Sequence, residues 1–150
     1  MSLFDLSIYI LVWIISVSIM TLFSIIASHL FNKEYREPII LSKIISTNNI
    51  KEKETGIDLF AGWIIHYFIG AIFIVFYFVL WHNFEQLKSV FWNIIVGLLF
   101  GIIGVVGWNL IFKIFPKLHD FDFKGFCIQL LPAHVFLCLF AMLLLNWLML

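Results

Sequence analysis

The stretch D-L-F-A-G-W-I-I-H-Y-F-I-G-A-I-F-I-V-F-Y-F-V-L-W, residues 58–81, decides the fold. After Asp58 it holds no formally charged side chain for 23 positions. At ~1.5 Å per residue, a helix of that length crosses a hydrocarbon layer of ~30 Å. One face, at steps of three and four residues, carries Trp63, His66, Tyr67, Gly70, Ile74, Tyr77 and Trp81. Because an imidazole facing lipid is costly unless paired, we expect this face to point at neighbouring helices.

The composition is that of an integral membrane protein. The chain of 150 residues is 63% hydrophobic, 19% aromatic and only 12% charged. Four apolar segments, at about residues 5–31, 58–82, 89–114 and 126–149, are each long enough to span a bilayer. They are continuously apolar and too long for the alternating strands of a membrane barrel. The sequence therefore predicts an all-α membrane protein, a four-transmembrane-helix bundle that forms a single domain over residues 1–150.

The connection between the first two spans contains a second helical pattern. Pro38 ends the first span, and apolar residues follow at helical spacing opposite Lys43. We predict a short cytoplasmic amphipathic segment over about residues 38–46. It would either lie on the membrane surface or pack under the bundle.

Charge placement predicts the orientation in the membrane. The net charge is zero, which gives no electrostatic case for a nucleic acid partner. Basic residues gather in the first and third connections, at Lys33, Arg36, Lys43, Lys51, Lys53, Lys113, Lys117 and Lys124. The second connection holds only Lys88. Because positive loops stay cytoplasmic, we expect both termini on the opposite, periplasmic side.

Polar groups on the four spans reach one depth in the membrane. His66 lies eight residues beyond Asp58, and His134 lies eight beyond Phe126, so both are ~12 Å below the cytoplasmic surface. The other candidates at this depth are Ser24, Tyr67, Trp108 and Asn109. This layer predicts a site that binds or passes a small ligand or a proton. The alternative is a structural or assembly subunit with no ligand, in which these groups only bond neighbouring helices.

Two histidines on different spans also allow cofactor chemistry. Neutral imidazoles of His66 and His134 could hold one haem b axially, close a transition-metal site whose metal is undetermined, or relay protons. Gly101 and Gly104 would give a haem room. The alternative function is therefore a membrane redox subunit.

The layer offers little for hydrolytic catalysis. The only acidic residue expected within the spans is Asp5, near the outer end of the first span. A nucleophilic triad or a pair of carboxylates therefore has no support at the depth of the histidines. The sequence favours a non-enzymatic function.

Small residues predict where helices pack closely. The candidates are Gly62, Gly70, Gly97, Gly101 and Gly104. Gly97 and Gly101 form a G-x-x-x-G motif, which lets a neighbouring backbone approach. We interpret this face as the surface against which the second span packs. Besides the lipid bilayer, a second copy of the chain or a membrane complex is left open as partner.

Two motifs carry a resemblance to a known group of proteins. G-W-I-I-H-Y-F-I-G-A-I-F in the second span and Q-L-L-P-A-H-V-F in the fourth resemble small bacterial inner-membrane proteins with a G-W-x-x-H-Y-x-x-G span. The chain is more loosely similar to the YagU-type proteins. The resemblance covers roughly residues 59–141 and implies a four-span fold in a bacterial inner membrane, with no established activity. It picks out Gly62, Trp63, His66, Tyr67, Gly70 and His134. Where such proteins often have glycine after the fourth-span histidine, this chain has Leu137 and Cys138.

Overall fold

A computed structural model describes residues 3–48, 55–115 and 121–149 of the chain. Its elements are α1 (Leu3–Phe31), α2 (Glu37–Asn48), α3 (Gly56–Asn83), the short 3-10 helix η1 (Glu85–Lys88), α4 (Val90–Ile114) and α5 (Phe123–Met149). In these ranges α1, α3, α4 and α5 are long and apolar enough to cross a membrane, and no strand occurs. The predicted all-α, four-span bundle is confirmed. The basic residues Lys51, Lys53 and Lys117 lie outside the described ranges.

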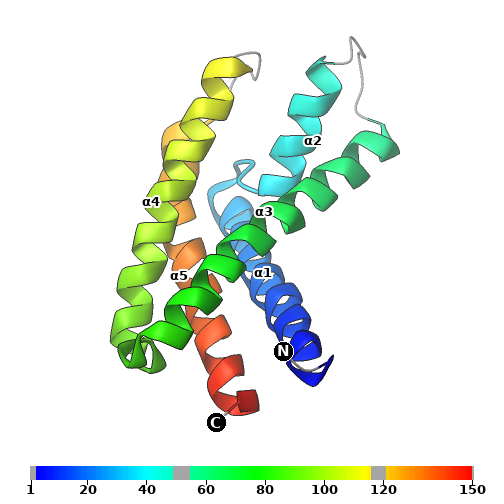
Figure 1. Ribbon diagram of the computed structural model, residues 1–150. Helices are drawn as coiled ribbons and strands as arrows, with labels where there is room; N and C mark the ends of the chain where they lie inside the picture. The colour runs from blue at the N-terminus through cyan, green and yellow to red at the C-terminus, as the bar shows by residue number, and fades with distance from the viewer. Residues whose placement is uncertain (1–2, 49–54, 116–120, 150) are drawn as a thin grey trace.

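The helices are arranged around α5. Its main contacts are with α4 and α1, and the third large helix contact joins α2 to α3. Figure 1 shows α3 crossing the bundle diagonally, with both termini at one end of the molecule and α2 at the other. Over the described residues α3 contacts α1 and α5 much less than it contacts α2. The orientation of α3 is therefore set mainly by α2.

The turn from α1 to α2 has a clear local cause. Asn32 follows the last residue of α1 with a φ of 51°, a left-handed conformation that asparagine tolerates better than most residues. The backbone N–H of Lys33 then donates to the carbonyl oxygen of Ser28 at 3.1 Å. Pro38 lies in the first turn of α2, where its missing N–H costs nothing. The chain thus changes direction within five residues and starts a new helix.

The short helix α2 is packed on the bundle. Ile40, Leu41 and Ile44 are all at least 93% buried, and Ser42 is buried as well. Gly62 of α3 makes the approach close, because a Cβ atom there would collide with the carbonyl oxygen of Pro38 and lie 2.8 Å from the backbone nitrogen of Ser42. Of the two placements that the sequence allows, the structure has the packed one.

The polar face of α3 is the buried face, as predicted. The buried residues of this helix are Asp58, Gly62, His66, Gly70, Ile74, Tyr77 and Trp81. Trp63 and Tyr67 are half-buried at its edge. Thr55 caps the helix through a capping box with Asp58, which satisfies two otherwise unpaired backbone N–H groups. The buried face therefore runs the whole length of α3.

A buried asparagine fixes the hairpin between α3 and α4. The hydroxyl of Tyr77 donates to Oδ1 of Asn93. The amide nitrogen of Asn93 donates to the carbonyl oxygens of Leu87 at 2.7 Å and Ser89 at 2.8 Å. Because every polar atom of this side chain is used, α3, η1 and α4 are held together at this end.

The small-residue face of α4 packs on α5. The prediction that this face packs on the second span is therefore wrong. A Cβ atom at Gly97 would lie 2.5 Å from the Cα atom of Val135, and one at Gly101 would lie 2.8 Å from the Cα atom of Leu131. A glycine face permits close approach by any helix. Its sequence does not specify which one.

We predict that Gly97→Ala lowers the thermal stability of the detergent-solubilised protein, whereas Gly107→Ala does not. The added methyl at position 97 meets backbone atoms of α5, which cannot move aside, and overpacking of this kind costs ~1–3 kcal/mol. A Cβ atom at Gly107 has no neighbour within 4 Å. Unfolding midpoints of the two variants provide the test, and equal midpoints would contradict the α4–α5 contact.

Candidate functional site

A cavity of about 560 Å³ lies between α3, α4 and α5. Most of its lining is apolar, and α2 contributes Glu37 and Leu41 at one end. Four lining residues of α3 and α4 are also exposed on the outer surface of the spans: Ile72, Phe76, Val79 and Ile103. The cavity therefore opens sideways between α3 and α4, where the acyl chains of a bilayer would lie.

The cavity is elongated along α3. Its lining on this helix runs from His66 to Leu80, which is ~21 Å at the helical rise. The ionisable residues among the described lining are Glu37 and His66, at the end where α2 packs, and His134, whose ring lies 5.0 Å from that of Phe73, midway between His66 and Leu80. A volume in this range is typical of a small-molecule site. Its shape offers one polar end and a long apolar channel.

Glu37 is the carboxyl at the polar end. Its side chain is 3% exposed, and Oε1 lies 3.1 Å from the hydroxyl of Ser24 on α1. The same hydroxyl lies 3.2 Å from Oε1 of Gln129 on α5. The other carboxyl oxygen of Glu37, Oε2, has no hydrogen-bond partner among the described residues. Burial raises the pKa of Glu37 to about 7, although hydrogen bonds from Ser24 and Gln129 oppose that shift.

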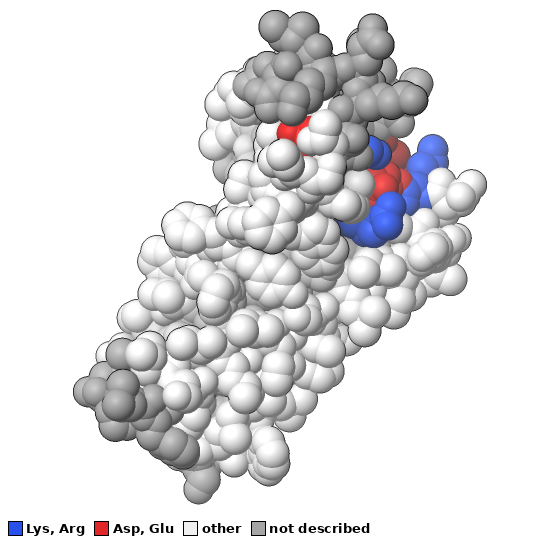
Figure 2. Space-filling view, turned by 90° about the vertical axis from the view of Figure 1, so that its right-hand side faces the viewer, with Lys and Arg blue, Asp and Glu red and all other residues white. Residues whose placement is uncertain are grey.

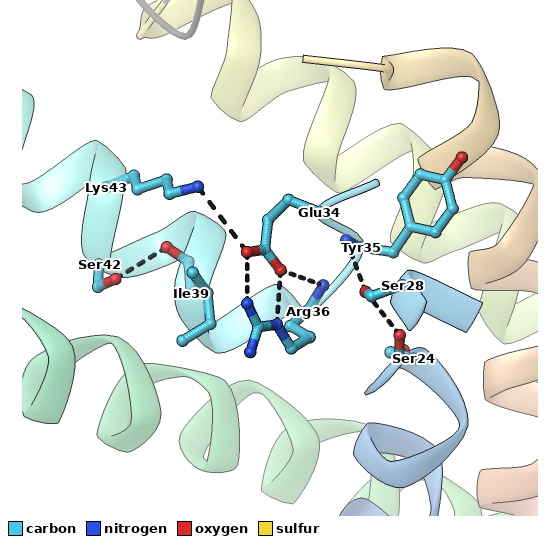
Figure 3. A network of polar contacts seen from close by, with 8 residues as sticks. All are labelled: Ser24, Ser28, Glu34, Tyr35, Arg36, Ile39, Ser42 and Lys43. Atoms are coloured by element: carbon cyan, nitrogen blue, oxygen red, sulfur yellow. Dashed lines mark hydrogen bonds and ion pairs between the residues drawn. The ribbon is translucent and has the colours of Figure 1, made fainter. Parts of the chain in front are cut away.

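The α1–α2 connection, shown in Figure 3, holds the chain just before Glu37 in place. The hydroxyl of Ser28 donates to the carbonyl oxygen of Ser24 at 2.8 Å and accepts from the backbone N–H of Tyr35 at 2.9 Å. The phenol of Tyr35 donates to Oδ2 of Asp122 at 2.8 Å, just before α5 begins. Three elements, α1, the connection and the start of α5, thus fix the chain two residues before Glu37.

A charged cluster covers the outside of this connection. Both carboxylate oxygens of Glu34 accept from the guanidinium of Arg36 at 2.7 Å, and Nζ of Lys43 lies 3.9 Å away. Figure 2 shows charged side chains gathered towards one end of the molecule, while the other described residues on that face are uncharged. Exposed ion pairs contribute little stability.

The two histidines have separate hydrogen-bond partners. Nε2 of His66 lies 2.8 Å from Oγ1 of Thr21 on α1. Nδ1 of His134 lies 2.9 Å from the carbonyl oxygen of Leu130. Both imidazoles line the same cavity, and the ring of His134 packs edge-on against Phe73 at 5.0 Å. The cavity, and not a direct bond, is what the two residues share.

The remaining residues of the expected layer are placed in different ways. Trp108 lines the cavity, and Ser24 reaches it through Glu37. Tyr67 points to α1, where its hydroxyl lies 2.8 Å from that of Ser18. Asn109 is exposed on the outer side of α4. Three spans thus bring His66, His134 and Trp108 together, while Tyr67 and Asn109 do not line the cavity.

Sequence reasoning missed Glu37 and Gln129. The sequence shows no carboxyl within the spans at this depth, but α2 packs against α3 and brings Glu37 to the cavity from outside the spans. One signal was available. Residues 37–46 carry apolar or small side chains around most of the helix, and such a helix is usually buried.

The geometry does not favour a metal or haem centre. Among the described residues, no group of three His, Cys, Asp or Glu side chains is placed to hold a metal ion. Axial haem ligation by His66 through Nε2 would require its bond to Thr21 to break. The donor set therefore fits a hydrogen-bonded ligand better than an iron porphyrin.

Comparison with protein-family models, with curated proteins and with solved structures finds no match. The resemblance to small bacterial inner-membrane proteins stays a prediction. The function must be inferred from the cavity itself.

We predict that, between about pH 4.5 and about pH 7, the stability of the protein falls relative to that of Glu37→Gln, which has the same other titratable groups. In that window the folded chain keeps the proton of Glu37 while the unfolded chain releases it. Rising pH therefore favours unfolding, by up to ~1.4 kcal/mol per pH unit. Unfolding midpoints in detergent across this range provide the measurement, and equal pH dependence in the two proteins would refute the buried carboxyl.

Proposed function

We propose that this multi-pass membrane protein is a non-enzymatic binding protein for a small, mainly apolar molecule. The molecule enters from the bilayer through the opening between α3 and α4. Its polar end meets Glu37, His66 and His134, and its apolar part lies along the channel towards Leu80. Passage of the ligand, or of a proton, along the same cavity is the related alternative.

One observation carries the proposal. A carboxyl oxygen of Glu37 has no partner in the described structure, yet its side chain is 97% buried beside an apolar cavity. An unsatisfied buried polar group costs ~1–3 kcal/mol, and more when it is charged. A ligand that bonds to this oxygen would offset that cost. A purely structural role for the layer gives no reason for the cavity or for the unpaired oxygen.

The haem alternative has less support. It needs one nitrogen from each histidine on a single iron; Nε2 of His134 has no hydrogen bond among the described residues that would prevent this, but Nε2 of His66 is engaged with Thr21. The structural alternative accounts for the hydrogen bonds of both histidines but not for the cavity. We therefore place ligand binding first.

The proposed location is a bacterial inner membrane, with α2 on the cytoplasmic side and both termini periplasmic. Arg36 and Lys43 lie at the α2 end, and basic residues there are expected to stay in the cytoplasm. The apolar opening between α3 and α4 would then face the bilayer core. A second copy of the chain or another membrane protein is the predicted partner that could cover this opening.

The test uses Trp108 as a reporter inside the cavity. A brominated long-chain alcohol should quench the fluorescence of Trp108 saturably. The contribution of Trp108 is the difference in quenching between the protein and Trp108→Phe. Gly107→Leu should raise the probe concentration at half-saturation by at least ~10-fold. Gly107 lines the cavity, and a Cβ atom there meets no atom within 4 Å, so the leucine side chain would occupy space that the probe needs.

The matched control is Val106→Leu, which adds bulk on the exposed side of α4. It should bind the probe as the unmodified protein does. Non-saturable quenching of Trp108, or equal binding by Gly107→Leu, would refute a ligand cavity.

A further inference from the structure

The hydrogen-bonding pattern of the cavity specifies the chemistry of the ligand's polar end. The first acceptor is Oε2 of Glu37, which is free in the described structure. When the carboxyl is ionised, this oxygen can only accept hydrogen bonds. Among the described residues that line the cavity, none is a Lys or an Arg. Its charge is therefore not balanced from within the lining.

The second acceptor follows from the bonds of His66. The hydroxyl of Thr21 donates its single hydrogen to the carbonyl oxygen of Val17 at 2.8 Å. Its oxygen must therefore accept from Nε2 of His66, which assigns the proton of this imidazole to Nε2. In the neutral ring, Nδ1 is then an acceptor.

The third acceptor follows in the same way. Nδ1 of His134 lies 2.9 Å from the carbonyl oxygen of Leu130, and a carbonyl can only accept, so Nδ1 carries the proton. Nε2 is then the acceptor. A Cβ atom at Gly104 would lie 3.3 Å from Nε2, and both residues line the cavity. The acceptor nitrogen of His134 therefore lies beside the α4 wall.

The lining offers few donors in return. Besides a protonated Glu37, the donor is the indole N–H of Trp108. The titratable groups that share the cavity with Glu37 are His66 from α3 and His134 from α5, whereas α1 and α4 contribute none to its lining. Three acceptors, with no cation among the described lining residues, disfavour an anionic group, which would be desolvated without a counter-charge.

We infer that the ligand is a long-chain amphiphile whose head donates hydrogen bonds, an alcohol or an amine, and is not an acid or a phosphate ester. This inference rests on the proposed function. The head would lie between Glu37 and the two imidazoles, with the chain extending along α3 towards the opening. A hydroxyl both donates to these acceptors and accepts from Trp108, while an ammonium also pairs with ionised Glu37.

The experiment compares four brominated probes of one chain length. They carry a hydroxyl, a primary amine, a carboxylate or no head, and each is titrated against the full chain in lipid nanodiscs above pH 7, where Glu37 is ionised. Binding is the saturable part of Trp108 quenching. The alcohol and the amine should reach half-saturation at least ~10-fold lower than the carboxylate and the headless chain.

Glu37→Gln separates the two heads, since it removes the charge but keeps the size of the side chain. The amine should lose most of its advantage in this variant, while the alcohol keeps part of it through the histidines. If the carboxylate or the headless chain binds as tightly as the alcohol and the amine, the inferred head is wrong and the binding function stands. If no probe quenches Trp108 saturably, the proposed function fails as well.

Discussion

The contact between the backbones of α2 and α3 at Gly62 is the constraint on which the rest of the structure depends. With no side chain at this position, the start of α2 lies directly against α3. Two results follow. Glu37, one residue before Pro38, is buried among the helices. In addition, α3 packs against α2 instead of against α4. Since Asn93 pins α3 to α4 only at the opposite end, the two helices diverge and leave a cavity between them.

Much of this fold can be predicted from the sequence, because bilayer length and helical periodicity act locally. The four spans follow from uninterrupted apolar runs, and the buried face of α3 follows from residues such as His66, Gly70 and Tyr77 at steps of three and four. These features need no knowledge of which helix lies next to which. They were accordingly predicted with nearly the residues that the structure shows.

The pairing of helices cannot be predicted in this way. Gly97 and Gly101 permit close approach but do not select α5 over α3. Counting residues along each span placed His66 and His134 at one depth. Depth does not specify towards which neighbour a side chain points, and Asn109, predicted at the same depth, faces outward. Glu37 was missed because its position depends on α2 packing against α3, and a carboxylate between Arg36 and Pro38 is ordinarily solvated.

The infrared spectrum of the protein provides the most direct test of the buried carboxyl at the polar end of the cavity. Protonated carboxylic acids have a carbonyl band distinct from that of carboxylates, and the difference between the protein and Glu37→Gln isolates the contribution of this residue. We expect a band that the variant lacks and that persists until the pH approaches about 7. A Glu37 already ionised at the pH where exposed carboxylates titrate would contradict the burial of this side chain and the site built on it.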